Sequence, residues 1–314
     1  MPRTVSPARR HTGRSRPLRI AAALVVLAAL GGYLTVQYIT GSQVIEGCTV
    51  RSADGSGGDG RTYRMSPEQA VNAATISAVG TSRGMPERAV TIALATALQE
   101  SGLRNIEHGD RDSLGLFQQR PSQGWGTEKQ ILDPVYSAGE FYRHLAEVPG
   151  YSRLPLTVAA QRVQRSGFPQ AYAKHEPDAA LLAAALTGRT PAALNCAPPR
   201  ATAAGPDASK VRAELVRAFG KEVLPAARTA PQDGGAAGAA ATSTVSVPVP
   251  APRASEDDGS ARRGWELAHW AVAQSEALRL DEVSYAGRVW EAGTGWRTER
   301  KESGTTDVRI RLAR

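Results

Sequence analysis

The stretch that decides the fold is Thr91–Arg120, TIALATALQESGLRNIEHGDRDSLGLFQQR. It begins as a run of Ala, Leu, Ile and Thr that is apolar on nearly every side, and a helix of this composition is a buried helix. One carboxylate, Glu100, stands at the C-terminal end of the run, and Gly102 is suited to ending the helix. We therefore expect a buried helix that begins at residues 85–87 and carries Glu100 near its end, followed by a polar loop that folds back over Glu100.

A carboxylate at the end of a buried apolar helix loses part of its hydration. Desolvation disfavours the charged form and raises the pKa of Glu100. A carboxylic acid that stays protonated near neutral pH can act as a general acid. The competing interpretation is a solvated residue in the last turn of a helix, which is the commoner role for a glutamate at such a position. The residues that follow Glu100 decide between the two.

These residues form an ordered set: Glu100-Ser101, Asn105, Ser113, Gly115-Leu116-Phe117-Gln118-Gln119 and Pro121. The set resembles the signature of lysozyme-like lytic transglycosylase domains of actinobacterial membrane-anchored cell-wall proteins. In that family a catalytic Glu-Ser pair ends one helix and a Ser…Gly-Leu-Met-Gln segment follows; here Phe117 stands where Met is usual. The resemblance covers about a third of the chain. It implies a mainly α fold, with a lysozyme-like helical domain over residues 62–198.

The resemblance also implies a reaction. The enzyme would cleave the glycosidic bond between N-acetylmuramic acid and N-acetylglucosamine in peptidoglycan. Glu100 would first act as acid and then as base, while the muramyl C6 hydroxyl attacks to give a 1,6-anhydro product. A muramidase-like hydrolase would instead need a second carboxylate at a definite separation, for which Asp110, Asp112 and Asp133 are the local candidates. We favour the single-glutamate mechanism. The residues expected to position substrate or Glu100 are Ser101, Ser113, Gln118, Gln119, Trp125 and Tyr172.

Two features keep alternatives open. Related enzymes carry a later Ala-Tyr-Asn string whose Tyr supports the catalytic Glu; this chain lacks it and has Gln161, Gln164 and Tyr172 in the corresponding region. The sequence does not choose among these three. Trp125, between two glycines, is either a sugar-stacking platform or a core aromatic. The missing string also supports a different function, that of a catalytically inactive cell-wall binding or scaffold protein of the envelope.

Charge and hydropathy indicate a membrane anchor. The formal net charge is +8, but residues 1–19 hold six Arg and no acid, so eight minus six leaves +2 for the rest. We therefore predict no nucleic-acid partner. Residues 20–39 carry no charge and have about the length of a bilayer core. The preceding Arg cluster places residues 1–19 in the cytoplasm and the bulk of a single-pass cell-membrane protein outside it. A cleaved signal peptide is the alternative.

The chain has two cysteines, Cys48 and Cys196. They lie in the expected extracytoplasmic part, where thiols usually pair, and they bracket the segment with the resemblance. We expect an intramolecular disulfide; two free thiols or an intermolecular pair are the alternatives. The five histidines form no ligand-spaced cluster and there is no Cys-x-x-Cys, so we predict neither a metal site nor a cofactor.

The remaining segments complete the expected organisation. Residues 40–61 are a flexible tether. Helices are expected over residues 66–79, where Ser66 and Gln69 form a capping box and Gly80 ends the helix, and over 128–132, 135–148, 156–165 and 179–186. Residues 199–262 are a disordered Ala/Pro/Gly-rich linker with one short helix over 208–224.

Residues 263–314 are expected to form a small α+β accessory domain without catalysis. Its helix would cover 264–280, and its strands 282–286, 288–290 and 307–312, where DVRIRL alternates cleanly. A lone His269 beside a tryptophan is more often structural than a metal ligand.

Overall fold

A computed structural model describes residues 47–52, 60–168, 170–198, 205–224, 244–249, 257–299 and 306–313. These residues build helices together with two antiparallel sheets. The mainly α, lysozyme-like fold class is therefore wrong, and the fold is α+β. The expected anchor over residues 20–39 lies outside the described residues. Among the helices that are described, none has the length and apolarity to span a membrane.

Helix α2 (Pro67–Ser82) begins at the predicted capping box. The Ser66 hydroxyl accepts from the Gln69 backbone N–H, and the Gln69 side chain accepts from the Ser66 backbone N–H. The helix continues through Gly80, which the sequence had predicted as its end. A Cβ on Gly80 would lie 2.6 Å from the Tyr142 hydroxyl oxygen of α5 (Pro134–Ala146). Glycine is thus present for the close approach of α5 and not to break α2.

Helix α3 (Glu87–Ser101) carries Glu100 and ends where the sequence predicted. Gly102 adopts φ 63°, the left-handed conformation that glycine tolerates best. Helices α2, α5, α6 and α7 surround α3. The helices that follow α3 agree with their predicted ranges to within a few residues; they are α4 (Glu128–Ile131), α5, α6 (Leu156–Gln164) and α7 (Glu176–Leu186).

A three-stranded sheet borders this helical cluster and was not predicted. Its strands are β1 (Cys48–Arg51), β2 (Thr62–Met65) and β3 (Leu194–Cys196), in the order β2-β1-β3. Strands of three or four residues are too short to show a period of two. Strand β1 therefore lies in the segment predicted as a flexible tether, and β2 and β3 lie in the segment predicted as a helical domain. Cys48 lies opposite Cys196 in the sheet, and the two are bonded. The intramolecular disulfide is confirmed.

The second sheet has five strands in the order β4-β8-β5-β6-β7. Strand β4 (Thr244–Pro248) falls in the expected disordered linker. Its Val245 and Val247 are fully buried, and Pro248 is tolerated because β4 is an edge strand. Strands at β5, β6 and β8 were predicted, whereas β4 and β7 were not; the bounds are β5 (Leu280–Tyr285), β6 (Arg288–Glu291), β7 (Gly295–Thr298) and β8 (Asp307–Leu312).

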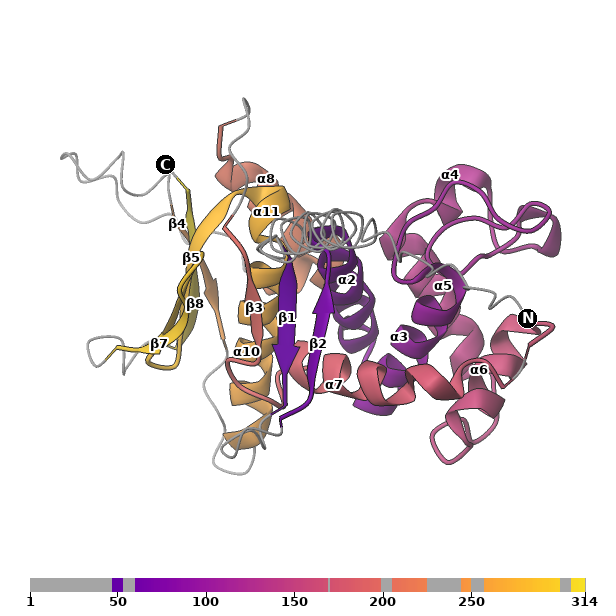
Figure 1. Ribbon diagram of the computed structural model, residues 1–314. Helices are drawn as coiled ribbons and strands as arrows, with labels where there is room; N and C mark the ends of the chain where they lie inside the picture. The colour runs from indigo at the N-terminus through magenta and orange to yellow at the C-terminus, as the bar shows by residue number, and fades with distance from the viewer. Residues whose placement is uncertain are drawn as a thin grey trace, which may run out of the picture. The chain divides into compact units, whose positions relative to one another are not determined.

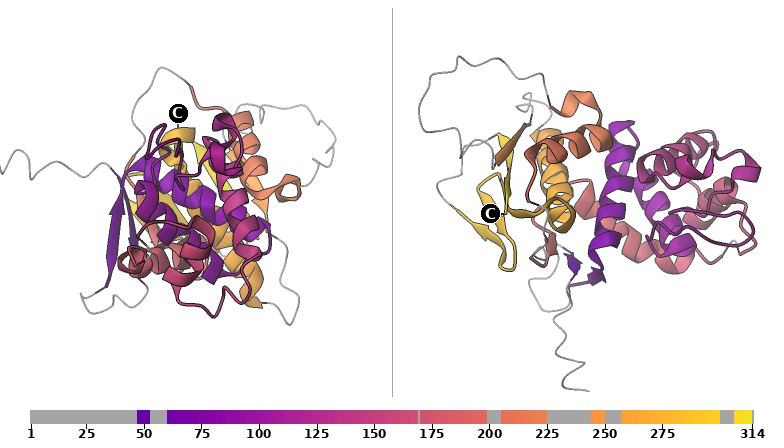
Figure 2. Two further views of the ribbon diagram at one scale, coloured as in Figure 1. Left: turned by 90° about the vertical axis from the view of Figure 1, so that its right-hand side faces the viewer. Right: turned by 90° about the horizontal axis from the view of Figure 1, so that it is seen from above.

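Helix α10 (Asp257–Ala273) lies between the five-stranded sheet and α2 (Figure 1 and Figure 2). It starts seven residues before the predicted helix and stops at Gln274, where the short α11 (Ser275–Leu278) begins. Helix α8 (Ala208–Phe219) also packs on α2. The linker prediction is therefore wrong at 244–248 and 257–262, while its residues 199–204, 225–243 and 250–256 lie outside the described residues.

His269 joins α10 to the three-stranded sheet. It is fully buried; its Nδ1 donates to the Ala185 carbonyl at 2.7 Å, and its Nε2 accepts from the Ala193 backbone N–H at 3.1 Å. Two tryptophans of the second sheet bond to β3 as well. Trp290 Nε1 donates to Asn195 Oδ1 at 2.7 Å, and Trp296 Nε1 donates to the Leu194 carbonyl at 2.8 Å.

The disulfide closes a loop across a sequence separation of 148. Removing it restores conformational freedom to the unfolded chain, so Cys48→Ser should lower the free energy of unfolding by about 2–5 kcal/mol. The measurement is chemical denaturation of the full chain under oxidising conditions. Reductant should destabilise the wild type and leave the variant unchanged. Equal stability of the wild type with and without reductant would contradict a stabilising role for the bond.

Burial lowers the pKa of His269 to about 4. The unfolded imidazole titrates near 6.5, so between these values the unfolded chain binds more protons. The free energy of unfolding should therefore fall as the pH drops from about 6.5 toward 4, by roughly 2–3 kcal/mol from this residue. Urea denaturation at pH 7 and pH 4.5 should show a smaller pH effect in His269→Gln than in wild type. The exposed His108 gives the control, His108→Gln, and the same pH effect in all three proteins would refute the assignment.

Candidate functional site

Glu100 occupies the last turn of α3 and is half-buried. The Tyr172 hydroxyl donates a hydrogen bond to Glu100 Oε1 at 2.7 Å, across 72 residues of sequence. Tyr172 stands just before the short 3-10 helix η2 (Ala173–His175), and its side chain is fully buried. A buried tyrosine is thus fixed against one oxygen of a half-buried carboxyl group.

Opposing effects set the protonation of Glu100. Burial is the largest and raises the pKa of Glu100, in the direction predicted from the sequence; hydrogen bonds from Tyr172 and Gln164 lower it in part. Burial also raises the pKa of Tyr172, followed by the charge of Glu100. Tyr172 therefore remains protonated, and its hydroxyl remains a donor to the carboxyl group.

The loop after Glu100 is held on the end of α3 by two side chains. Ser101 Oγ donates to the Leu116 carbonyl at 2.8 Å. Gln164, the last residue of α6, donates through Nε2 to the Phe117 carbonyl at 2.6 Å. The Gln164 side chain also lowers the pKa of Glu100, so the amide that holds the loop acts on the carboxyl group as well.

The loop closes on itself because of its local sequence. Leu114 and Gln119 exchange backbone hydrogen bonds of 2.9 and 3.0 Å, which makes a one-bridge hairpin. Gly115 at its turn has φ 73°, and a Cβ there would lie 2.8 Å from the Ile131 carbonyl. Phe117, in place of the usual Met, stacks on Phe141 of α5 with 4.7 Å between ring centroids. The substitution therefore has a packing partner.

The other predicted site residues make contacts within the loop that follows Glu100 or with the helices beside it. Gln119 is buried and donates to the Ser137 carbonyl at 3.1 Å. Gln118 Nε2 donates to the Gly115 carbonyl at 3.3 Å, and Ser113 is buried. Trp125 is partly buried and lies against His144, with 4.2 Å between ring centroids. These contacts place the four side chains in loop and core packing, whereas Ser101 and Tyr172 act at the end of α3.

The candidates for a second carboxylate have other contacts. Asp112 pairs with Arg120 at 2.7 Å and accepts from the Ser122 backbone at 2.8 Å, and hydrogen bonds from these residues lower its pKa. Asp133 caps α5 by accepting from the Val135 backbone N–H at 2.9 Å. Asp110 is exposed. Asp112 and Asp133 are thus used to hold the loop and to start a helix.

Sequence reasoning left Gln164 as one of three alternatives and did not name Ser166, whose side chain acts on the pKa of Tyr172. No local pattern points to either, because both come near Glu100 or Tyr172 only in the folded chain. Gln161 instead donates to the Ser166 carbonyl at 2.7 Å. In the described ranges, no group of three His, Cys, Asp or Glu side chains is arranged to hold a metal ion.

One family model, described as VldE, C-terminal domain, matches residues 200–309. The match covers about a third of the chain and includes α8, α10 and strands β4 to β7. It lies entirely C-terminal to the Glu100 stretch, and its description states no activity. No curated protein gives a significant match to the chain.

Replacing Tyr172 by Phe should raise the pKa of Glu100 further. The change keeps the ring and removes a donor that favours the carboxylate. A hydrogen bond to a charged group contributes about 1.5–3 kcal/mol, which corresponds to roughly 1–2 pH units. The measurement is an NMR titration of the Glu100 side-chain carboxyl carbon. Tyr151→Phe is the control, and an unchanged or lower pKa in Tyr172→Phe would show that the hydroxyl does not support the carboxylate.

Proposed function

We propose that the Glu100 site cleaves glycosidic bonds in the glycan strands of peptidoglycan, with Glu100 as both acid and base. The observation that carries the proposal is the 2.7 Å hydrogen bond from Tyr172 to a half-buried Glu100. This is the support that the resemblance assigns to the tyrosine of the missing Ala-Tyr-Asn string. The resemblance of the Glu100 stretch supplies the substrate class.

In the first step the protonated Glu100 donates its proton to the oxygen that links N-acetylmuramic acid to N-acetylglucosamine. The bond from that oxygen to the muramyl C1 breaks, and the glucosaminyl part leaves as an alcohol. Burial favours the acid form that starts this step. The Tyr172 hydroxyl and the Gln164 amide then stabilise the carboxylate that remains, because both bonds favour the charged form.

In the second step the Glu100 carboxylate takes the proton of the muramyl C6 hydroxyl, whose oxygen bonds to C1. The product is a 1,6-anhydro sugar, and Glu100 returns to its acid form. A hydrolase would use a second carboxylate. The engagement of Asp112 with Arg120 and of Asp133 with the start of α5 favours the single-glutamate reaction.

The location that fits this function is the outer side of the cell membrane. The Cys48–Cys196 disulfide is typical of an oxidising, extracytoplasmic compartment. Residues 1–19, with six Arg, and the uncharged residues 20–39 fit a single-pass anchor with a cytoplasmic N-terminus. Peptidoglycan and the membrane are the proposed partners.

Glu100→Gln should abolish most of the cleavage. Glutamine keeps the size of the side chain and can accept from Tyr172, but it cannot transfer a proton. General acid–base groups contribute about 10²–10⁴-fold, and one residue serves both steps here, so the loss should lie at the upper end or beyond. The measurement is mass spectrometry of fragments released from purified cell wall by the full chain. Gln118→Ala should reduce the rate less, because its amide bonds within its own loop.

The products separate the possible reactions. Anhydro ends support the transglycosylase, whereas reducing ends indicate hydrolysis with water as the nucleophile. If the wild type binds cell wall without any cleavage, the alternative function, a catalytically inactive binding or scaffold protein, would be supported instead. Full activity of Glu100→Gln, with unchanged thermal unfolding, would show that Glu100 is not the catalytic acid and base.

A further inference from the structure

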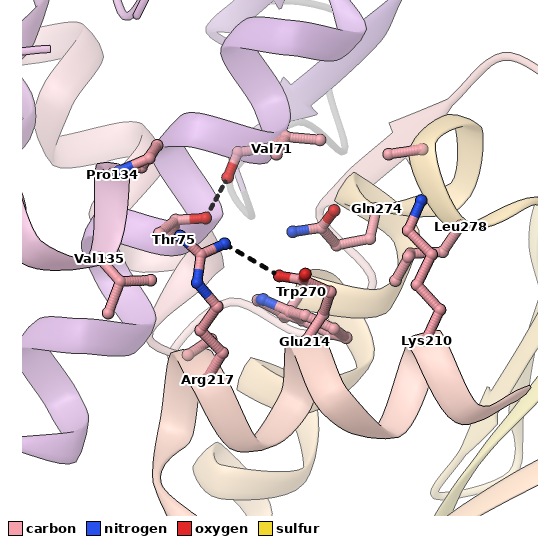
Figure 3. A pocket seen from close by; sticks show the side chains of 12 residues that line it. Val71, Thr75, Pro134, Val135, Lys210, Glu214, Arg217, Trp270, Gln274 and Leu278 are labelled. Atoms are coloured by element: carbon pink, nitrogen blue, oxygen red, sulfur yellow. Dashed lines mark hydrogen bonds and ion pairs between the residues drawn. The ribbon is translucent and has the colours of Figure 1, made fainter. Parts of the chain in front are cut away.

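A second site lies on a different part of the fold from Glu100. A cavity of about 210 Å³ opens between α8, α10 and α11 on one side and α2 and α5 on the other (Figure 3). Val71, Val135 and Leu278 give it apolar walls. This volume is below the 300–1,000 Å³ common for drug-sized ligands, so it suits a molecule of a few carbon atoms.

One wall of the cavity carries a donor without a partner. The Trp270 side chain is 1% exposed, and its indole N–H makes no hydrogen bond within the described part of the chain. The indole nitrogen faces the space enclosed by the lining side chains (Figure 3). An unpaired buried donor is costly, so a ligand that offers an acceptor at this point would relieve the cost.

Two further polar groups reach the same space. Gln274, where α10 ends, is 5% exposed and turns its amide into the cavity (Figure 3). The Thr75 hydroxyl donates to the Val71 carbonyl at 2.8 Å, which leaves its oxygen able to accept. The cavity thus combines apolar walls with a few converging polar groups, as small-molecule sites do.

The charged residues at the rim are not equivalent. Arg217 is neutralised by Asp133 at 2.5 Å and by Glu214 at 3.3 Å. Lys210 lies seven residues, about two turns, before Arg217 on α8. It forms no ion pair with a carboxylate of the described ranges, although Asp207 and Lys210 interact by charge. The cation that remains for a ligand is therefore the Lys210 ammonium group.

We propose that this cavity binds a small organic carboxylate. One carboxylate oxygen accepts from the Trp270 indole N–H, the negative charge faces Lys210, and a short aliphatic body lies against Val71, Val135 and Leu278. The proposal is independent of the Glu100 reaction, because no residue of the cavity belongs to that site.

The experiment observes the indole N–H directly. The full chain, labelled with ¹⁵N-tryptophan, has five indole signals, one for each Trp, and Trp270→Phe identifies the Trp270 signal. Titration with sodium butyrate should shift that signal saturably. Trp290 is the internal control, because its indole N–H already donates to Asn195 and should not move. A Trp270 signal that does not respond to millimolar butyrate would overturn the site.

Two variants on one helix test the charge. Lys210→Met should weaken butyrate binding about two- to fivefold, the range expected for an exposed ion pair. Arg212→Met, on the exposed side of α8, should leave the affinity unchanged. Butyramide has the shape of butyrate without its charge and should bind more weakly to the wild type. Equal affinities for butyramide and butyrate, or equal weakening by both variants, would refute a carboxylate site.

Discussion

Strand β3 is the point on which the rest of the structure depends. Within three residues it holds the disulfide to β1 and accepts the indole N–H groups of Trp290 and Trp296. The residue just before it donates to the buried His269 of α10. Both sheets and helix α10 are therefore connected at β3 and the residue before it. This explains why the described residues after Glu46 form a single compact unit, although the composition suggests two domains joined by a linker.

The features predicted correctly from the sequence are local ones. The Ser66–Gln69 box starts α2 and Gly102 ends α3, because capping needs only neighbouring residues. The features that were missed depend on distant partners. Strands β1 and β3 exist through pairing with each other, and β4 exists through its pairing with β8 and its contact with α8. Gly80 was taken for a helix end because its partner, Tyr142, comes 62 positions later.

The candidate site shows the same division. The sequence placed Glu100 at the end of a buried helix, which is sufficient to predict a raised pKa. Burial alone, however, gives an acid that resists becoming a carboxylate, and the proposed second step needs the carboxylate. Gln164, at the end of α6, and Tyr172, in the segment after it, supply the compensating interactions. Their roles could not be assigned from spacing, because the family string that would identify them is absent.

The C-terminal part of the chain also reaches the loop that follows Glu100. Arg217 of α8, within the interval matched by the family model, bonds at 2.5 Å to Asp133, the capping residue of α5. The preceding carbonyl, that of Leu132, accepts from Asn105 Nδ2 at 2.7 Å, and Asn105 lies in the sequence between Glu100 and the Leu114–Gln119 hairpin. Two contacts, joined through the adjacent residues Leu132 and Asp133, thus connect α8 to this loop. A site built from positioned side chains needs a rigid support, and through these contacts α8 and α5 support the segment that follows Glu100.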